Sequence, residues 1–103
     1  MKFTINGKEY EGAKYNYNTS CAFEEMGVSI ADFAKKPQSI MRAYLAISGK
    51  IELEEAGDEI EQHVINGGDL NGITEVLAKE MQESGFFKSL QEMAKEESPK
   101  RKK

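Results

Sequence analysis

The chain has 103 residues, 39% hydrophobic and 31% charged, with a formal net charge of −4. This length suits one small domain with a modest core, and no stretch approaches the roughly 20 apolar residues needed to cross a bilayer. The body is acidic, since residues 1–98 carry 18 acids and 10 bases and the last residues add four bases, which argues against nucleic acid or an anionic membrane as its partner.

The first predicted element is a β-hairpin over residues 2–11. Asn6-Gly7 separates two alternating runs and favours a type I′ turn, because both positions must tolerate positive φ. The register that this turn fixes places Phe3, Ile5 and Tyr10 on one apolar face. Since a lone hairpin is marginal in water, we expect this face to pack on the helices that follow.

Short helical patterns fill the chain from the hairpin to residue 94. The predicted helices run from a cap at Asn18, Thr19 or Ser20 to Met26, from Ile30 to Lys35, from a cap at Ser39 to Gly49, from Leu53 to Asn66, from a cap at Asp69 to a break at Gly85, and from Phe86 to Ala94. The widest apolar stripe, at Ile40, Tyr44 and Ile47, predicts that its helix crosses the centre of the domain.

The fold class expected from these elements is mainly α, with an N-terminal β-hairpin packed on a bundle of four to six short helices. Residues 1–95 are predicted to form a single helical domain. From residue 96 the composition turns to charge, so residues 96–103 are predicted to be a disordered basic tail.

The residues that usually carry catalysis or bind metals are scarce. His63 is the single histidine, and we interpret it as a partly exposed helix residue; Cys21 is the single cysteine, and we interpret it as a small buried hydrophobe. The acid-rich stretch 52–61 contains Gly57 but lacks the ligand alternation of a calcium loop. We therefore expect no catalytic residue, no metal site, no cofactor and no enzyme activity, and the reducing cytoplasm is the simplest compartment.

The apolar residues of the last two helices are the candidates for binding a partner. Phe86 and Phe87 lie beside a glycine hinge and a charged end, and short amphipathic helices of this kind often recognise partners. The alternative is that this segment packs on the core of its own domain. The candidate partner-binding residues are Ile73, Leu77, Met81, Phe86, Phe87, Leu90 and Met93.

Four runs of the sequence are Met1 to Glu11, Tyr15 to Ile30, Leu53 to Asp58, and Glu83 to Phe87. In this order and spacing they resemble the tail assembly chaperones of long-tailed bacteriophages, especially those of Gram-positive hosts. The resemblance covers roughly residues 1–94. Each run alone is a weak signal, and the specificity lies in their combination.

The resemblance implies a non-catalytic protein of phage or prophage origin that binds the tape-measure protein and keeps it soluble during tail morphogenesis. Such a protein acts in the host cytoplasm and is absent from the mature virion. The resemblance also implies a homo-oligomer, leaves a contact with the tail-tube protein open, and involves no membrane. Family members often occur as a short and a frameshifted longer form, and the consecutive lysines at the end of this chain would fit a slippery codon run.

Two alternatives remain open at the level of sequence. One is a small regulatory protein that associates with nucleic acid through its basic C-terminal tail, which a steep dependence of binding on salt would reveal. The acidic body and the lack of a basic helix stripe argue against it. The other is a permanent tail component, which would be found in purified virions.

Overall fold

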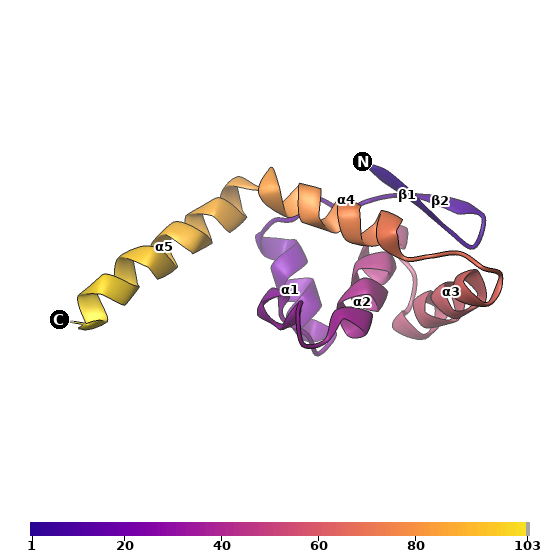
Figure 1. Cartoon of the computed structure of the whole chain (residues 1–103), viewed down its shortest axis with the longest axis horizontal. Helices are drawn as coiled ribbons and strands as arrows, with labels where there is room; N and C mark the ends of the chain where they lie inside the picture. The colour runs from indigo at the N-terminus through magenta and orange to yellow at the C-terminus, as the bar shows by residue number, and fades with distance from the viewer. Residues whose placement is uncertain (103) are drawn as a thin grey trace.

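The computed structural model describes the backbone of residues 1–102 and the side chains of residues 1–93. A two-stranded antiparallel hairpin precedes five α-helices, which confirms the predicted fold class (Figure 1). The elements are β1 (Lys2–Ile5), β2 (Lys8–Glu11), α1 (Tyr17–Glu25), the 3-10 turn η1 (Ile30–Asp32), α2 (Pro37–Gly49), α3 (Leu53–Ile65), α4 (Asn71–Gln82) and α5 (Gly85–Lys102).

The hairpin has the predicted turn and register. Asn6 and Gly7 both take positive φ values, of 53° and 77°, and Phe3 pairs with Tyr10. Their rings stack with centroids 5.7 Å apart, and the Phe3 and Ile5 side chains are buried. As expected, the apolar face lies on the helices, since β1 packs against α4 and α3, and β2 against α2.

Helix α2 forms the centre of the core, as its wide apolar stripe predicted. Six of its side chains are buried, among them Ile40, Tyr44 and Leu45. Phe23 from α1 and Leu77 from α4 pack into the same cluster. Strand β2, η1 and the helices α1, α3 and α4 all contact this one helix.

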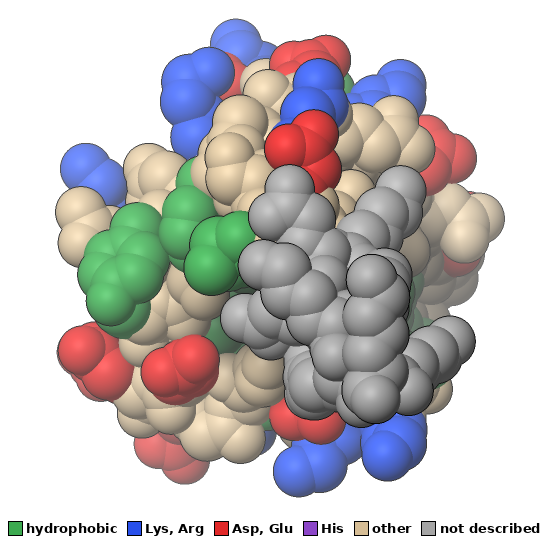
Figure 2. All heavy atoms as spheres, turned by 90° about the vertical axis from the view of Figure 1, so that its left-hand side faces the viewer, with side chains coloured by type: hydrophobic (Ala, Val, Ile, Leu, Met, Phe, Trp, Pro, Cys, Tyr) green, Lys and Arg blue, Asp and Glu red, His purple; other side chains and the backbone are tan. Residues whose placement is uncertain are grey.

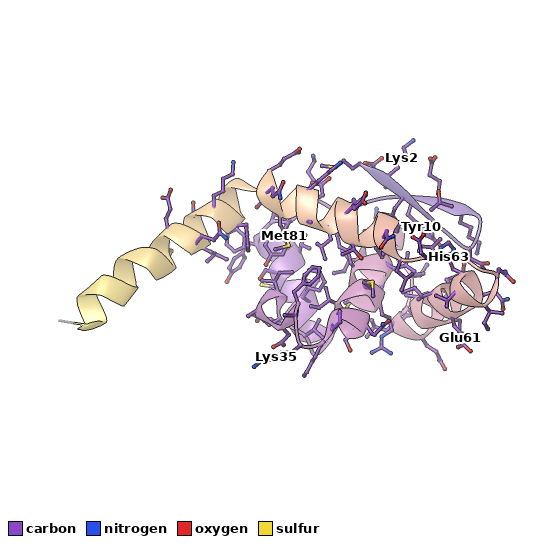
Figure 3. The ribbon with its side chains drawn as sticks, viewed as in Figure 1. Lys2, Tyr10, Lys35, Glu61, His63 and Met81 are labelled. Atoms are coloured by element: carbon purple, nitrogen blue, oxygen red, sulfur yellow. The ribbon has the colours of Figure 1, made fainter. Side chains whose placement is uncertain are left out.

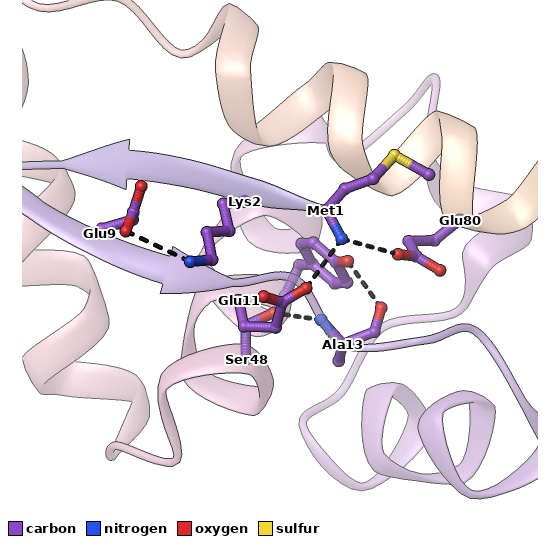
Figure 4. A network of polar contacts seen from close by, with 8 residues as sticks. Met1, Lys2, Glu9, Glu11, Ala13, Ser48 and Glu80 are labelled. Atoms are coloured by element: carbon purple, nitrogen blue, oxygen red, sulfur yellow. Dashed lines mark hydrogen bonds and ion pairs between the residues drawn. The ribbon is translucent and has the colours of Figure 1, made fainter.

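A network of polar contacts fastens the base of the hairpin to α2 and α4 (Figure 4). The hydroxyl of Tyr44 donates to the backbone oxygen of Ala13 at 2.7 Å, and the hydroxyl of Ser48 accepts from the Ala13 N–H at 3.0 Å. The Met1 amine lies 2.8 Å from a Glu11 oxygen and 3.6 Å from an oxygen of the buried Glu80. The connector after β2 therefore has both backbone groups of Ala13 bonded to side chains of α2.

Several helix starts differ from the predicted ones, including that of α4, which has Leu70 and not the predicted Asp69 at its N-cap position. Asn16 caps α1, its side chain accepting from the Thr19 N–H at 2.9 Å, so this helix begins earlier than the predicted caps. Helix α2 begins at Pro37, before the predicted cap at Ser39, because proline has a φ suited to the first helical position and needs no N–H partner there. A helical turn begins at Ile30 as predicted and carries a capping box of Ser29 and Asp32, but it ends at Asp32 and not at the predicted Lys35.

Helix α5 leaves the body of the molecule after a break between Gln82 and Gly85, close to the predicted hinge (Figure 1). It continues to Lys102, beyond the predicted end at Ala94, and the Lys, Glu and Arg residues in this stretch are good helix formers. The tail's side chains and the whole of Lys103 lie outside the described residues. The disorder of residues 96–103 and the domain boundary at residue 95 therefore stay predictions.

The projecting α5 makes the molecule long and narrow. Its extents are 54 × 23 × 22 Å, with α5 at one end and α3 with the hairpin turn at the other (Figure 1). Within residues 1–102, no helix is both long enough and apolar enough to span a membrane.

Candidate functional site

The joint between α4 and α5 is fixed by Ser84. This buried side chain donates to the backbone oxygen of Tyr15 at 2.6 Å and accepts from the backbone N–H of Phe87 at 3.0 Å. It therefore caps the first turn of α5 and ties that turn to the connector before α1. The rings of Phe86 and Phe87 pack on Tyr15, with centroids 6.1 and 5.8 Å away, which sets the direction in which α5 leaves the body.

An exposed apolar surface follows this joint along α5. We call it the α5 patch, and it consists of Tyr17, Phe86, Leu90 and Met93. Tyr17 meets Phe86 edge to face with centroids 5.6 Å apart, and the exposed fractions are 67% for Tyr17, 37% for Leu90 and 56% for Met93. Figure 2 looks onto this end of the molecule and shows hydrophobic side chains gathered on one part of the face. Single exposed apolar residues are ordinary, but a contiguous group is typical of a docking surface.

The structure places the seven predicted partner-binding residues in three kinds of surroundings. Ile73 and Leu77 are fully buried in the core, so their side chains hold α4 on the domain and face no partner in this conformation. Met81, Phe86 and Phe87 are half-buried against the core, and Figure 3 labels Met81. Phe86 also joins Leu90 and Met93 in the α5 patch. The alternative that this segment packs on its own core thus describes Phe86 and Phe87 better than Leu90 or Met93.

A second hollowed surface lies between α2 and α3, and we call it the α2–α3 groove. Its volume is about 640 Å³. Its apolar wall is formed by Ile60, Val64, Ile65 and Leu70, with Arg42 and Glu61 among the polar side chains. Val64 and Ile65 are 49% and 66% exposed. Ala56 of α3 is fully buried, and the last turn of this helix meets the hairpin through His63, while Val64 and Ile65 stay exposed at the groove.

The residues considered for metal binding or catalysis lie outside the α5 patch and the α2–α3 groove. His63 is half-buried on α3, in agreement with its interpretation as a partly exposed helix residue, and both of its ring nitrogens are bonded to backbone groups. Cys21 is a free thiol of intermediate exposure and not the buried hydrophobe that we predicted. Among the residues that the structure describes, no three His, Cys, Asp or Glu side chains are grouped so that they could hold a metal ion.

The shifted pKa values lie at the base of the hairpin and have structural causes. The hydrogen bond with Glu11 raises the pKa of the Met1 amine, and the same bond lowers the pKa of the Glu11 carboxyl. Burial raises the pKa of both Tyr10 and Tyr44. These groups tie elements together and lie in neither the α5 patch nor the α2–α3 groove.

Two parts of these surfaces were missed in the sequence. Tyr17 joins the α5 patch from a position 69 residues before Phe86, and no periodic pattern connects the two. Ile65 is the second of two adjacent apolar residues before Asn66-Gly67-Gly68, and only one of the two could face the body. Two adjacent apolar residues at the end of a helix were therefore the signal in the sequence that one of them would be exposed to solvent.

No family model, curated protein or solved structure matches this chain. The assignment of a function therefore depends on the surfaces themselves and on the resemblance found in the sequence.

Proposed function

We propose that this chain is a phage or prophage tail assembly chaperone. In this role it binds the tape-measure protein through the α5 patch and keeps that protein soluble in the host cytoplasm until tail-tube subunits cover it. It makes and breaks no covalent bond, and it leaves before the virion is complete. The observation that carries the proposal is the apolar α5 patch on a helix that projects from a small acidic body.

The chemistry of the patch suits a helical client. Phe86, Leu90 and Met93 follow one another at intervals of four and three residues, which places them on one side of α5. A long helix-prone protein with apolar stripes offers the complementary surface, and helices commonly join through such stripes. Methionine is flexible and polarizable, so it can adapt to client helices of differing sequence.

The acidic body would serve the same role. Residues 1–98 carry an excess of eight negative charges, which keeps a complex with an apolar client from aggregating. The four sequence runs that resemble tail assembly chaperones support the proposal independently of the patch.

Co-expression with the tape-measure protein of the same genome tests the proposal. The chain is expected to move this client from the pellet to the soluble fraction and to co-purify with it. The substitution Met93→Glu, which places a charge in the patch, is expected to abolish both effects. Gln91→Glu, an exposed residue of the same helix outside the patch, is the matched control and should behave as the wild type. A client equally soluble with and without the chain would contradict the proposal.

A further inference from the structure

The imidazole of His63 lies between the hairpin and the end of α3, and its two neighbours fix where its hydrogen sits (Figure 3). Nε2 lies 2.9 Å from the backbone oxygen of Asp69, which only accepts hydrogen bonds, so Nε2 carries a hydrogen. Nδ1 lies 2.8 Å from the backbone nitrogen of Asn6, which only donates, so Nδ1 carries none. Two backbone groups that never ionise therefore select one tautomer of the neutral ring.

We propose that His63 is a pH-sensitive latch: when its ring takes up a second proton, the hairpin tip is released from α3, while the connector after α3 stays bound. The second proton goes to Nδ1, where it faces the N–H of Asn6, a donor against a donor. Nε2 is still a donor in the cation, so its bond to Asp69 persists. Histidine ordinarily changes its charge between about pH 5 and 8, so the latch would respond to mild acid.

The charges around His63 favour uptake of the proton. Glu59 on α3 and Asp69 on the connector are acids, and Lys8 at the hairpin tip is a base. Side chains of these types keep their charges between about pH 5.5 and 7.5. Tyr10 on the hairpin stays neutral, because burial raises its pKa. Two negative charges and one positive charge lie near the ring, so the surroundings attract a cation.

Glu59 connects the proton to the other contacts of the hairpin tip. One of its oxygens lies 3.3 Å from Nδ2 of Asn6, and the other lies 3.3 Å from Nζ of Lys8. Glu59 precedes His63 by four residues, so the two side chains are neighbours on the surface of α3. A positively charged ring competes for this carboxylate with Asn6 and Lys8. Protonation therefore weakens three contacts of the tip and not only one.

Gly68 allows the connector to close on the ring. A Cβ atom at this position would lie 2.4 Å from Nε2 and 2.5 Å from Cε1 of His63. The ring could make room only by giving up its bonds to Asn6 and Asp69. A larger residue at position 68 should therefore open the latch at every pH.

Release is confined to the tip, because the base of the hairpin is held by other groups. Tyr44 and Ser48 bond to the backbone of Ala13, and Phe3 is buried in the core. The two hydroxyl groups are neutral in mild acid, so these contacts persist when His63 is charged. The domain should thus remain folded while its tip opens. This behaviour needs no partner and does not depend on the proposed function.

Hydrogen exchange of the purified full chain, followed by NMR, tests the latch. Between about pH 7.5 and 5.5 the protection factor of the Asn6 amide should fall about tenfold, as expected for one lost hydrogen bond. The amides of Gly68, on the connector, and Leu45, in the core, should keep their protection. Shifts of the ring nitrogens should show the hydrogen on Nε2 at the higher pH. The ring should titrate at the pH at which Asn6 loses protection.

Substitutions separate the ring from its charged neighbours. His63→Asn offers an amide oxygen near the place of Nδ1, so Asn6 should be protected equally at both pH values. His63→Ala and Gly68→Ala should leave Asn6 poorly protected at both. Glu59→Gln keeps an acceptor for Asn6 but removes the charge, so the loss of protection should remain and move to lower pH.

Three results would each overturn the proposal. The first is a hydrogen on Nδ1 of His63 at the higher pH, and the second is an Asn6 protection factor that does not change between the two pH values. The third is a loss of protection that survives in His63→Asn. The first two need only the wild type, so the proposal can be refuted even if a variant folds poorly.

Discussion

The backbone N–H of Asn6 donates a 2.8 Å hydrogen bond to Nδ1 of His63, which joins the tip of the hairpin to the end of α3 across 57 residues of sequence. The other ring nitrogen, Nε2, lies 2.9 Å from the backbone oxygen of Asp69 and donates to it, because Nδ1 is already the acceptor. One imidazole thus holds three segments together (Figure 3).

Replacing His63 should loosen this junction. His63→Ala removes two hydrogen bonds and leaves the Asn6 N–H without its acceptor, so we expect the free energy of unfolding to fall by about 1–3 kcal/mol in urea titrations. Gln62→Ala, an exposed neighbour on the same helix, should change stability by no more than about 0.5 kcal/mol. Equal stabilities of the two variants would show that the imidazole bonds contribute nothing.

The hydroxyl of Tyr44 provides a second test at the base of the hairpin. Tyr44→Phe keeps the ring in the core but leaves the Ala13 oxygen unbonded, which should destabilise the fold by about 1–2 kcal/mol near neutral pH. Ser48→Ala, which frees the Ala13 N–H, should have a similar effect. The two losses should not be additive, since both act on one residue of the connector. Chemical denaturation of the two single variants and the double variant measures this coupling.

The same tyrosine makes stability dependent on alkaline pH. Burial raises the pKa of Tyr44 above its ordinary value of 10.0, so the folded state holds this proton more tightly than the unfolded chain. The contribution of the protonated Tyr44 hydroxyl to the free energy of unfolding is fully present below pH 10.0, and it is lost as the pH rises above that value. Denaturation curves on both sides of pH 10 should show a shallower alkaline loss for Tyr44→Phe than for the wild type. Parallel losses would contradict this cause.

Gly12 should tolerate no side chain. A Cβ atom there would lie 2.5 Å from Cγ1 of Val76 and 2.7 Å from Oη of Tyr44, two groups fixed in the core. We expect Gly12→Ala to lower the unfolding free energy by about 1–3 kcal/mol. The second substitution Val76→Ala, which removes one obstacle, should make the double variant more stable than the sum of its parts predicts.

A glycine in open surroundings provides the control for Gly12. At Gly72 in α4, the nearest atom to an added Cβ would be Cβ of Phe3, at an ordinary contact distance of 3.8 Å. Gly72→Ala should therefore stabilise the helix by up to about 1 kcal/mol. Thermal unfolding of both variants should give shifts of opposite sign, and a loss of stability in both would refute the steric explanation.

The Ser84 hydroxyl should determine how firmly α5 is joined to the body. Ser84→Ala removes the cap of α5 and the bond to Tyr15, at an expected cost of about 1–2 kcal/mol. Hydrogen exchange should show faster exchange of the amides in the first turn of α5, while the amides of α2 remain protected. Ser89→Ala, at an exposed position of α5, should leave both regions unchanged.

Local signals in the sequence predicted much of the fold. Asn6-Gly7 fixed the hairpin register, and the stripe of α2 identified the central helix. Each of these signals involves residues within a few positions of one another. The starts of α1 and α2 were misplaced because several neighbouring residues were suitable caps or first residues, and only the surrounding structure selects one of them.

The candidate surfaces were less predictable, because they depend on contacts between distant segments. Ile73 and Leu90 both belong to apolar helix faces, but only the packed structure shows that Ile73 is covered and Leu90 is exposed. Tyr17 reaches the α5 patch through the joint at Ser84, which is 69 residues from its partner Tyr15. Periodicity indicates which side of a helix is apolar and does not indicate what covers that side.

The projecting α5 also increases the apparent size of this chain in gel filtration. The radius of gyration is 15.0 Å, whereas a compact chain of this length would have a value of about 13 Å. A radius of 15 Å is typical of a compact protein of roughly 150 residues. A single copy should therefore leave a gel-filtration column early, at the volume of a globular protein about half as large again.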